Sequence, residues 1–251
     1  MKNVLIIAIS LSIGLNTVIE AQSGEVIYDM KYYNSPVKEA KLYFDGDISY
    51  FIYDKITPEE QLSKSNYTRQ ADGSYMKSKK TGDSIGMIVY KQINPNQVVS
   101  REIMASVPYL ITEDFTTLDW KLTPETKKIE GFNCQKANTS FRGREYEAWF
   151  TNDIAVTAGP WKLWGVPGLI LEVYDKTQEV GFYFKSIALN KPVKEFIKMP
   201  SQGMQVTRQK FLAKRTEARE KAEQMLQTYA DKGIKVDTKS LGRKSLELET
   251  P

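Results

Sequence analysis

Four aromatic residues between positions 149 and 174 are the side chains of this sequence best suited to hold a ligand. They are Trp149, Trp161, Trp164 and Tyr174. Aromatic rings exposed on a sheet form stacking platforms for sugars or walls for lipid chains, whereas rings within strands commonly fill a core. Trp149 stands in a strand-like run and is expected in the core, while Trp161 and Trp164 stand in a Gly/Pro-rich crossing and are the better surface candidates. We take Trp161, Trp164 and Tyr174 as candidate ligand-binding residues.

Charged residues lie beside these rings, namely Arg142, Arg144, Glu145 and Glu147. Arg144 either contacts an anion through two parallel hydrogen bonds or pairs with a strand carboxylate and helps to fix the sheet, and we expect the second role. It is the fourth candidate binding residue. Two neighbouring carboxyl groups are also the minimal set for acid–base hydrolysis. The sequence gives neither their separation nor their burial, so a carboxylate-dependent hydrolase stays an alternative.

The chain has no histidine and a single cysteine, Cys134. Ser-His-Asp and Cys-His nucleophilic systems and His- or Cys-rich zinc sites are therefore excluded. The sequence also lacks the patterns of calcium loops, Walker phosphate loops and dinucleotide-binding loops. We expect no metal and no cofactor, and the remaining residue types favour a binding protein over an enzyme. Cys134 is expected as a buried thiol, because no intrachain disulfide can form.

Short segments with apolar residues at every second position recur along most of the chain and predict strands. Asp45-Gly46-Asp47 and Arg142-Gly143-Arg144 are turn signals that join neighbouring strands as hairpins. Residues 56–70 are either a short helix or a polar loop. The spacing of the strands is typical of sandwiches, barrels and half-barrels. The expected strands are residues 25–33, 40–44, 48–53, 74–79, 84–92, 97–105, 108–112, 119–122, 127–129, 132–141, 145–151, 169–174 and 180–189.

One long segment breaks this pattern and predicts a helix over residues 207–232. Thr207 is a suitable N-cap, Gly233 is a suitable residue after the last turn, and neither Pro nor Gly lies between them. We interpret its basic half as a solvated face rather than a contact for lipid or polyanion. The polar residues 234–251 are expected to be a loosely ordered tail.

The first residues have the pattern of a secretory signal peptide, with Lys2, an apolar run from Val4 to Val18, and Ala21 at a cleavage position. The run is shorter than the roughly 20 apolar residues that span a bilayer. We therefore expect residues 1–21 to be removed and residues 22–233 to form one exported domain. The net charge of +4 gives no indication of nucleic-acid binding.

A hexapeptide, Gly165-Val166-Pro167-Gly168-Leu169-Ile170, follows several further blocks in the segment from residue 119 to residue 175. Together they resemble the GLPGLI family, secreted proteins of certain Gram-negative bacteria, with Val166 where the family name has Leu. The proline of the hexapeptide restricts its own φ angle, and the glycines can adopt the positive φ angles that other residues avoid. The neighbouring blocks are residues 126–129 (TKKI), 131–137 (GFNCQKA), 141–144 (FRGR), 148–151 (AWFT) and 159–161 (GPW).

This resemblance implies a bowl-shaped antiparallel β structure located in the periplasm or at the outer membrane. It assigns no catalytic residue, although a related module precedes some glycan-releasing amidases. We thus expect a mainly β fold with one long C-terminal α-helix, its curved antiparallel sheet bowl-like or half-barrel.

For the function, we expect a non-enzymatic binding or accessory module for a hydrophobic or glycan ligand or an outer-membrane partner. The main alternative is a periplasmic lipid or lipoprotein carrier of half-barrel type, which requires an apolar concave cavity of several hundred Å³. The hydrolase alternative requires two acidic groups that share a cleft and have perturbed pKa values.

Overall fold

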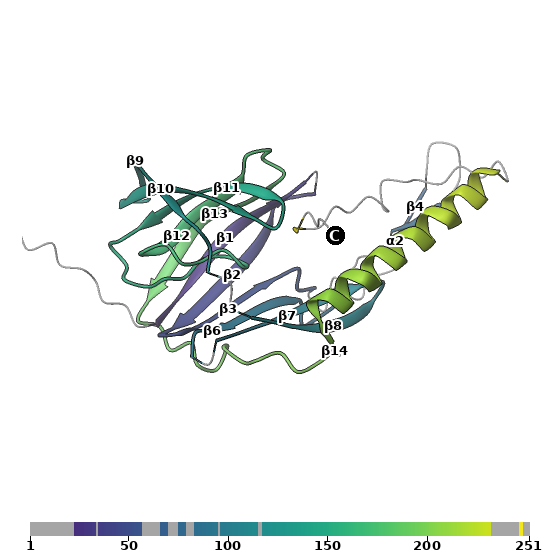
Figure 1. Ribbon diagram of the computed structural model, residues 1–251, viewed down its shortest axis with the longest axis horizontal. Helices are drawn as coiled ribbons and strands as arrows, with labels where there is room; N and C mark the ends of the chain where they lie inside the picture. The colour runs from purple at the N-terminus through teal and green to yellow at the C-terminus, as the bar shows by residue number, and fades with distance from the viewer. Residues whose placement is uncertain are drawn as a thin grey trace, which may run out of the picture.

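The computed structural model describes residues 23–33, 35–56, 66–69, 75–78, 83–94, 96–114, 117–231 and 246–247. The predicted signal peptide, residues 57–65 and 70 of the helix-or-loop segment and most of the predicted tail lie outside these residues. Residues 66–69 of the helix-or-loop segment form a short strand, so neither a helix nor a loop is correct there. Strands dominate the described part, and one long helix follows them (Figure 1). The prediction of a mainly β chain with a C-terminal helix is therefore confirmed.

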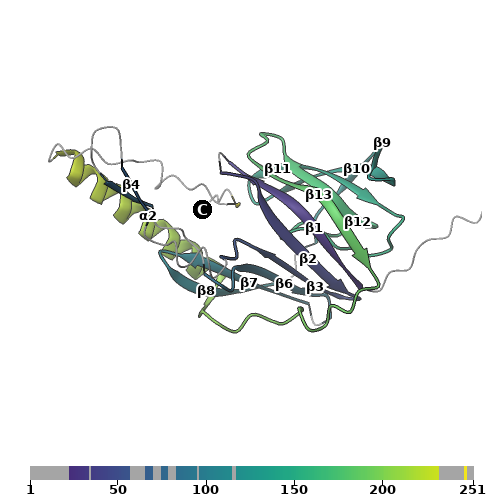
Figure 2. The ribbon, with the colours of Figure 1, turned by 180° about the vertical axis from the view of Figure 1, so that it is seen from behind.

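Twelve of the described strands form one open sheet in the order β14-β8-β7-β6-β3-β2-β1-β13-β12-β11-β10-β9. Neighbouring strands are antiparallel, except that β14 runs parallel to β8. The sheet is strongly curved, with β9 to β13, β1 and β2 in one wall and β3, β6, β7 and β8 in the other (Figures 1 and 2). The strands are β1 (Ser23–Tyr32), β2 (Lys38–Asp45), β3 (Ile48–Tyr53), β6 (Met87–Gln92), β7 (Gln97–Met104), β8 (Val107–Glu113), β9 (Lys121–Ile129), β10 (Phe132–Phe141), β11 (Arg144–Thr151), β12 (Leu169–Asp175), β13 (Val180–Leu189) and β14 (Met204–Thr207), with β4 (Asn66–Arg69) and β5 (Tyr75–Ser78) paired separately.

Alternation along the strands explains which face of the sheet is buried. In β1, Val26, Tyr28 and Met30 point to one side and are all buried, as a period of two requires. The predicted turns also form as hairpins. At the β10–β11 turn both central residues, Arg142 and Gly143, have positive φ angles, 51° and 78°, the combination that fits the right-handed twist of a hairpin.

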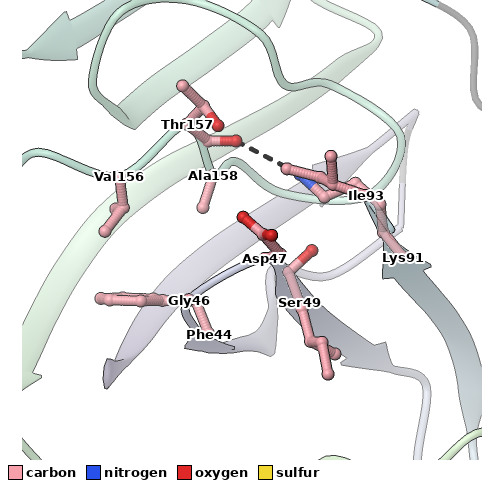
Figure 3. A pocket seen from close by; sticks show the side chains of 10 residues that line it. Phe44, Gly46, Asp47, Ser49, Lys91, Ile93, Val156, Thr157 and Ala158 are labelled. Carbon is pink, nitrogen blue, oxygen red and sulfur yellow. Dashed lines mark hydrogen bonds between the residues drawn. The ribbon is translucent and has the colours of Figure 1, made fainter. Parts of the chain in front are cut away.

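The interior of the curved sheet is filled by the connection between β11 and β12. This segment, residues 152–168, we call the crossing. Lys91 of β6 donates a hydrogen bond from Nζ to the carbonyl oxygen of Thr157, 3.2 Å away, which ties the crossing to the wall formed by β3 and β6. A small pocket beside this contact (Figure 3) has a volume of about 10 Å³, room for at most one water molecule. The crossing buries Ile154, Ala158, Trp161, Leu163, Trp164 and Val166 in the same core as the strands.

The helix α2 (Arg208–Asp231) begins where predicted, and the hydroxyl of Thr207 accepts a hydrogen bond from the amide of Lys210 at 3.3 Å. Phe211 is the helix residue buried against the sheet, where it contacts Tyr109 edge-on at 5.4 Å between ring centroids. Most of the remaining helix side chains are exposed, among them Lys210, Lys214 and Arg219. No described helix is long and apolar enough to cross a membrane.

Candidate functional site

An aromatic and charged patch lies on the outer face of the sheet over β9 to β13. The side chains of Tyr146, Ala148 and Phe150 are fully buried in the core, so the alternating positions of β11 face outward. The structure brings outward-facing side chains of five neighbouring strands together there. We call this the aromatic patch, and its members are Lys127, Lys136, Glu147, Trp149, Glu172, Tyr174 and Tyr183.

Two tyrosines form the flat part of the aromatic patch. The rings of Tyr174 and Tyr183 are stacked with centroids 6.0 Å apart and an angle of 16° between their planes. The residue opposite Tyr174 in the register is Gly181, and a Cβ atom added there would lie 2.7 Å from the ring of Tyr183. The Tyr183 ring therefore lies flat over the strand because position 181 has no side chain.

Hydrogen bonds hold the patch in one geometry. Trp149 donates from Nε1 to the hydroxyl of Tyr174 at 3.3 Å, and that hydroxyl donates in turn to a carboxylate oxygen of Glu147. Burial, together with the bond to Glu147, raises the pKa of Tyr174. The hydroxyl consequently stays protonated and continues to donate throughout the neutral range.

Lysine and glutamate side chains surround the rings. Lys136 Nζ lies 2.8 Å from Glu147, and Lys127 Nζ pairs with Glu172 while lying 4.5 Å above the centroid of the Trp149 ring. Partial burial is the largest single effect on the pKa of Glu147 and acts to raise it, but the hydrogen bonds from Lys136 and Tyr174 and the charge of Lys136 together outweigh it, and the pKa lies below its usual value. The patch thus presents ring faces beside ionised acceptors and ammonium donors, the combination that binds polar ligands with apolar faces.

The structure places the predicted ligand-binding residues in different surroundings. Tyr174 lies on the outer face of the sheet, in the aromatic patch. Trp161 and Trp164 are only 2% and 4% exposed, so their assignment as surface candidates is wrong. The Gly/Pro-rich crossing folds inward between the walls instead of running over the surface. Trp149 is buried as expected, but it is covered by the two lysines of the outer face.

Arg144 has the sheet-fixing role rather than that of an exposed anion contact. Its guanidinium pairs with Asp175 of β12, and both side chains are 1% exposed. The same guanidinium donates to the hydroxyl of Tyr33 and, from Nε, to the carbonyl oxygen of Leu246 at 3.1 Å. It therefore joins β11, β12, the end of β1 and a residue near the end of the chain.

The hexapeptide from Gly165 to Ile170 is a packing element. Val166, Leu169 and Ile170 are fully buried. The amide of Gly168 donates to the carbonyl oxygen of Val166 at 2.8 Å, which makes a tight bend before β12. The motif therefore shapes the entry into β12 and presents no side chain of these three residues to a ligand.

Sequence reasoning missed Tyr183 and the Lys127, Lys136 and Glu172 members of the aromatic patch. The alternation in residues 180–189 does place Gly181 and Tyr183 on the face opposite Val180 and Phe182. What it cannot give is the register, which puts Gly181 opposite Tyr174. Without that pairing, the stack of the two rings cannot be derived.

Among the described acidic residues, Glu102 of β7 has the pKa that is raised most clearly above its usual value. Burial raises the pKa of its carboxyl to about 7, against the opposing effect of Lys162. The hydrolase alternative needs a second carboxyl in a shared cleft, and Glu102 lines neither the pocket at the crossing nor the one between Asp45 and Lys194. No group of three described His, Cys, Asp or Glu residues is arranged to hold a metal ion.

We predict that Glu102→Gln stabilises the protein at pH 8 but not at pH 4. The folded-state pKa lies above that of the unfolded chain, so the contribution of Glu102 to stability is complete below about pH 4.3 and is lost as the pH rises through 7. The expected gain for the variant at pH 8 is about 1–2 kcal/mol, discounted because the side chain is partly exposed. Urea unfolding at both pH values measures it, and an equal difference at the two would contradict the assignment.

Comparison with known proteins finds one family match and a likeness of fold. Residues 87–199, from β6 past β13, match the family model described as "N-glycanase peptide, N-terminal domain". The solved structures titled "Structure of PNGF-II in P21 space group" and "Structure of PNGF-II in C2 space group" each superpose with a TM-score of 0.52 at 18% identity. The alignments cover 77% of this chain but only 33% and 32% of those chains, so this chain spans about a third of their length. A search of curated proteins found no match.

Proposed function

We propose that this chain is an exported, non-enzymatic module that binds a glycan on the outer face of its sheet. The observation that carries the proposal is the stacked pair Tyr174–Tyr183 beside the ionised Glu147. Sugar rings have apolar faces that stack on aromatic rings and hydroxyls that donate to carboxylates. All members of the aromatic patch lie in the span that matches the N-terminal domain of an N-glycanase, and this supports a glycan as the ligand.

The cellular setting is part of the same proposal. The pattern of residues 1–21 and the resemblance to the GLPGLI family support export to the periplasm or outer membrane of a Gram-negative bacterium. In that compartment the chain serves as an accessory that holds glycans, alone or for an enzyme or envelope partner. Binding needs no histidine or metal, so it agrees with the composition.

Two hollows bear on the lipid-carrier alternative. The one at the crossing has a volume of about 10 Å³, far below the several hundred Å³ that a lipid chain needs. The other, about 370 Å³ in size, is lined partly by the charged residues Asp45, Lys194 and Glu195. Within the described residues the interior is packed with side chains, and we therefore place the ligand on the outer face.

The proposal predicts that removing both stacked rings weakens glycan binding by about five- to 150-fold. In Tyr174→Ala/Tyr183→Ala the sugar loses two stacking contacts of about 0.5–1.5 kcal/mol each. Calorimetric titration with the N-linked chitobiose core and with a high-mannose N-glycan measures the loss. Gly181→Ala offers a second route, because the added Cβ would push the Tyr183 ring off the strand.

Phe196→Ala is the matched control. Phe196 is 42% exposed and stacks on Tyr43 at 5.1 Å on a different part of the sheet. This variant should bind glycans as the parent chain does. Failure of the parent chain to bind either glycan, or equal loss in the control and the double variant, would end the proposal.

A further inference from the structure

Leu246 and Glu247 are bound by the rest of the chain as a ligand would be. Both are buried, at 7% and 8% exposure, and these two residues depart from the loosely ordered tail expected over 234–251. Both views place them between the curved sheet and α2 (Figures 1 and 2). They meet the protein through an apolar side chain, a carbonyl group and a carboxylate.

Three cations from separate elements converge on the carboxylate of Glu247. Lys162 Nζ of the crossing lies 2.8 Å from it, a guanidinium nitrogen of Arg208 at the start of α2 lies 3.0 Å away, and one of Arg142 in the β10–β11 turn lies 3.3 Å away. Lys162 is itself buried, with its side chain 4% exposed. Charge-assisted hydrogen bonds in such surroundings are strong and geometrically selective.

The same three cations share one further carboxylate, that of Glu113 at the end of β8. Arg142 lies 2.6 Å from it, Lys162 pairs with it as well, and Arg208 approaches to 3.7 Å. If Glu247 left, Glu113 would be the one described carboxylate paired with all three cations, and Lys162 would keep its electrostatic interaction with Glu102. Buried charges need partners, so the group is built to hold a second carboxylate.

The residue before the carboxylate is recognised too. Leu246 packs into the main hydrophobic cluster, and its carbonyl oxygen accepts the hydrogen bond from Arg144 Nε at 3.1 Å. A free anion would use the cations but not these two contacts. The contacts therefore suit a peptide segment with an apolar residue directly before a glutamate.

We propose that Arg142, Lys162 and Arg208, with Arg144 beside them, form a binding site for an apolar–acidic peptide segment, and that Leu246–Glu247 occupy it in cis. The site lies apart from the aromatic patch, and the proposal is independent of glycan binding. A peptide of the same chemistry binds in trans once the cis segment no longer competes.

The test uses the full chain with Leu246→Ser, Glu247→Gln and Glu249→Gln, the last so that the neighbouring glutamate cannot take over. The probe is a capped synthetic peptide of residues 242–248, which contains Glu247 as its one acidic residue. Calorimetry should show this peptide binding at least tenfold more tightly to the variant than to the parent chain. Peptides with Glu247→Gln or Leu246→Ser should each bind at least tenfold more weakly than the parent peptide.

A second variant covers the case in which the triple variant does not fold. Glu247→Gln/Glu249→Gln keeps Leu246 in its apolar contacts and removes only charge, and it should also gain peptide binding over the parent chain. Absence of peptide binding to every folded variant would overturn the proposal, as would equal binding of the Glu247→Gln peptide. Binding of glucuronate without binding of the peptide would also overturn it, because the site would then be a sugar-acid site.

Discussion

Arg144→Met is expected to lower the free energy of unfolding by about 3–5 kcal/mol, because removing one member of a buried ion pair leaves the other charged and unpaired. The partner is Asp175, and neither side chain is more than 1% exposed. Asp175 would keep its hydrogen bonds from the amide of Val180 at 2.9 Å and the hydroxyl of Thr177 at 2.6 Å. These donors carry no charge, so they do not compensate the negative charge of the Asp175 carboxylate.

Urea unfolding monitored by tryptophan fluorescence measures the change, and two comparisons make it specific. Lys221→Met breaks the exposed pair with Glu217 on α2 and should produce no measurable change. The double variant Arg144→Met/Asp175→Asn removes the stranded charge and should be more stable than Arg144→Met alone. If the double variant instead lost the sum of two independent penalties, the pair would not be the reason for the loss.

Local patterns in the sequence predicted most of the strands because their pairing is mostly between neighbours along the chain. The runs 132–141 and 180–189 coincide with β10 and β13. The strands expected at residues 119–122 and 127–129 are in fact one strand, β9, which continues through Pro124. The reason is that β9 is the last strand of the sheet, and an edge strand tolerates a residue without an amide hydrogen.

Non-local contacts account for what the sequence did not show. β14 was not expected, because four residues acquire strand character only by pairing in parallel with the distant β8. The burial of Trp161 has the same origin. Its local Gly/Pro surroundings predict irregular backbone correctly, since Trp161 adopts a φ of 53°, but they do not reveal that the irregular segment lies between two walls of a curved sheet. The aromatic patch likewise depends on how five strands are aligned with one another. The alternation of apolar and polar residues within one strand does not reveal that alignment.

The hexapeptide from Gly165 to Ile170 stabilises the fold through packing rather than through a reactive side chain. Gly168→Ala tests this role. A Cβ atom at position 168 would lie 2.1 Å from the carbonyl oxygen of Thr151. Thr151 is fully buried and pairs with both Cys134 and Leu169, so its carbonyl cannot retreat without separating β10, β11 and β12.

We expect Gly168→Ala to lower the free energy of unfolding by more than about 3 kcal/mol, in the range that marks a specific structural conflict. Gly46→Ala is the matched control, because Gly46 also has a positive φ, 54°, but no atom lies within 4 Å of the added Cβ. The control should lose about 1–2 kcal/mol from backbone strain alone. If Gly168→Ala were as stable as the control, the strand ends could separate at little cost. The hexapeptide would then not be needed for packing.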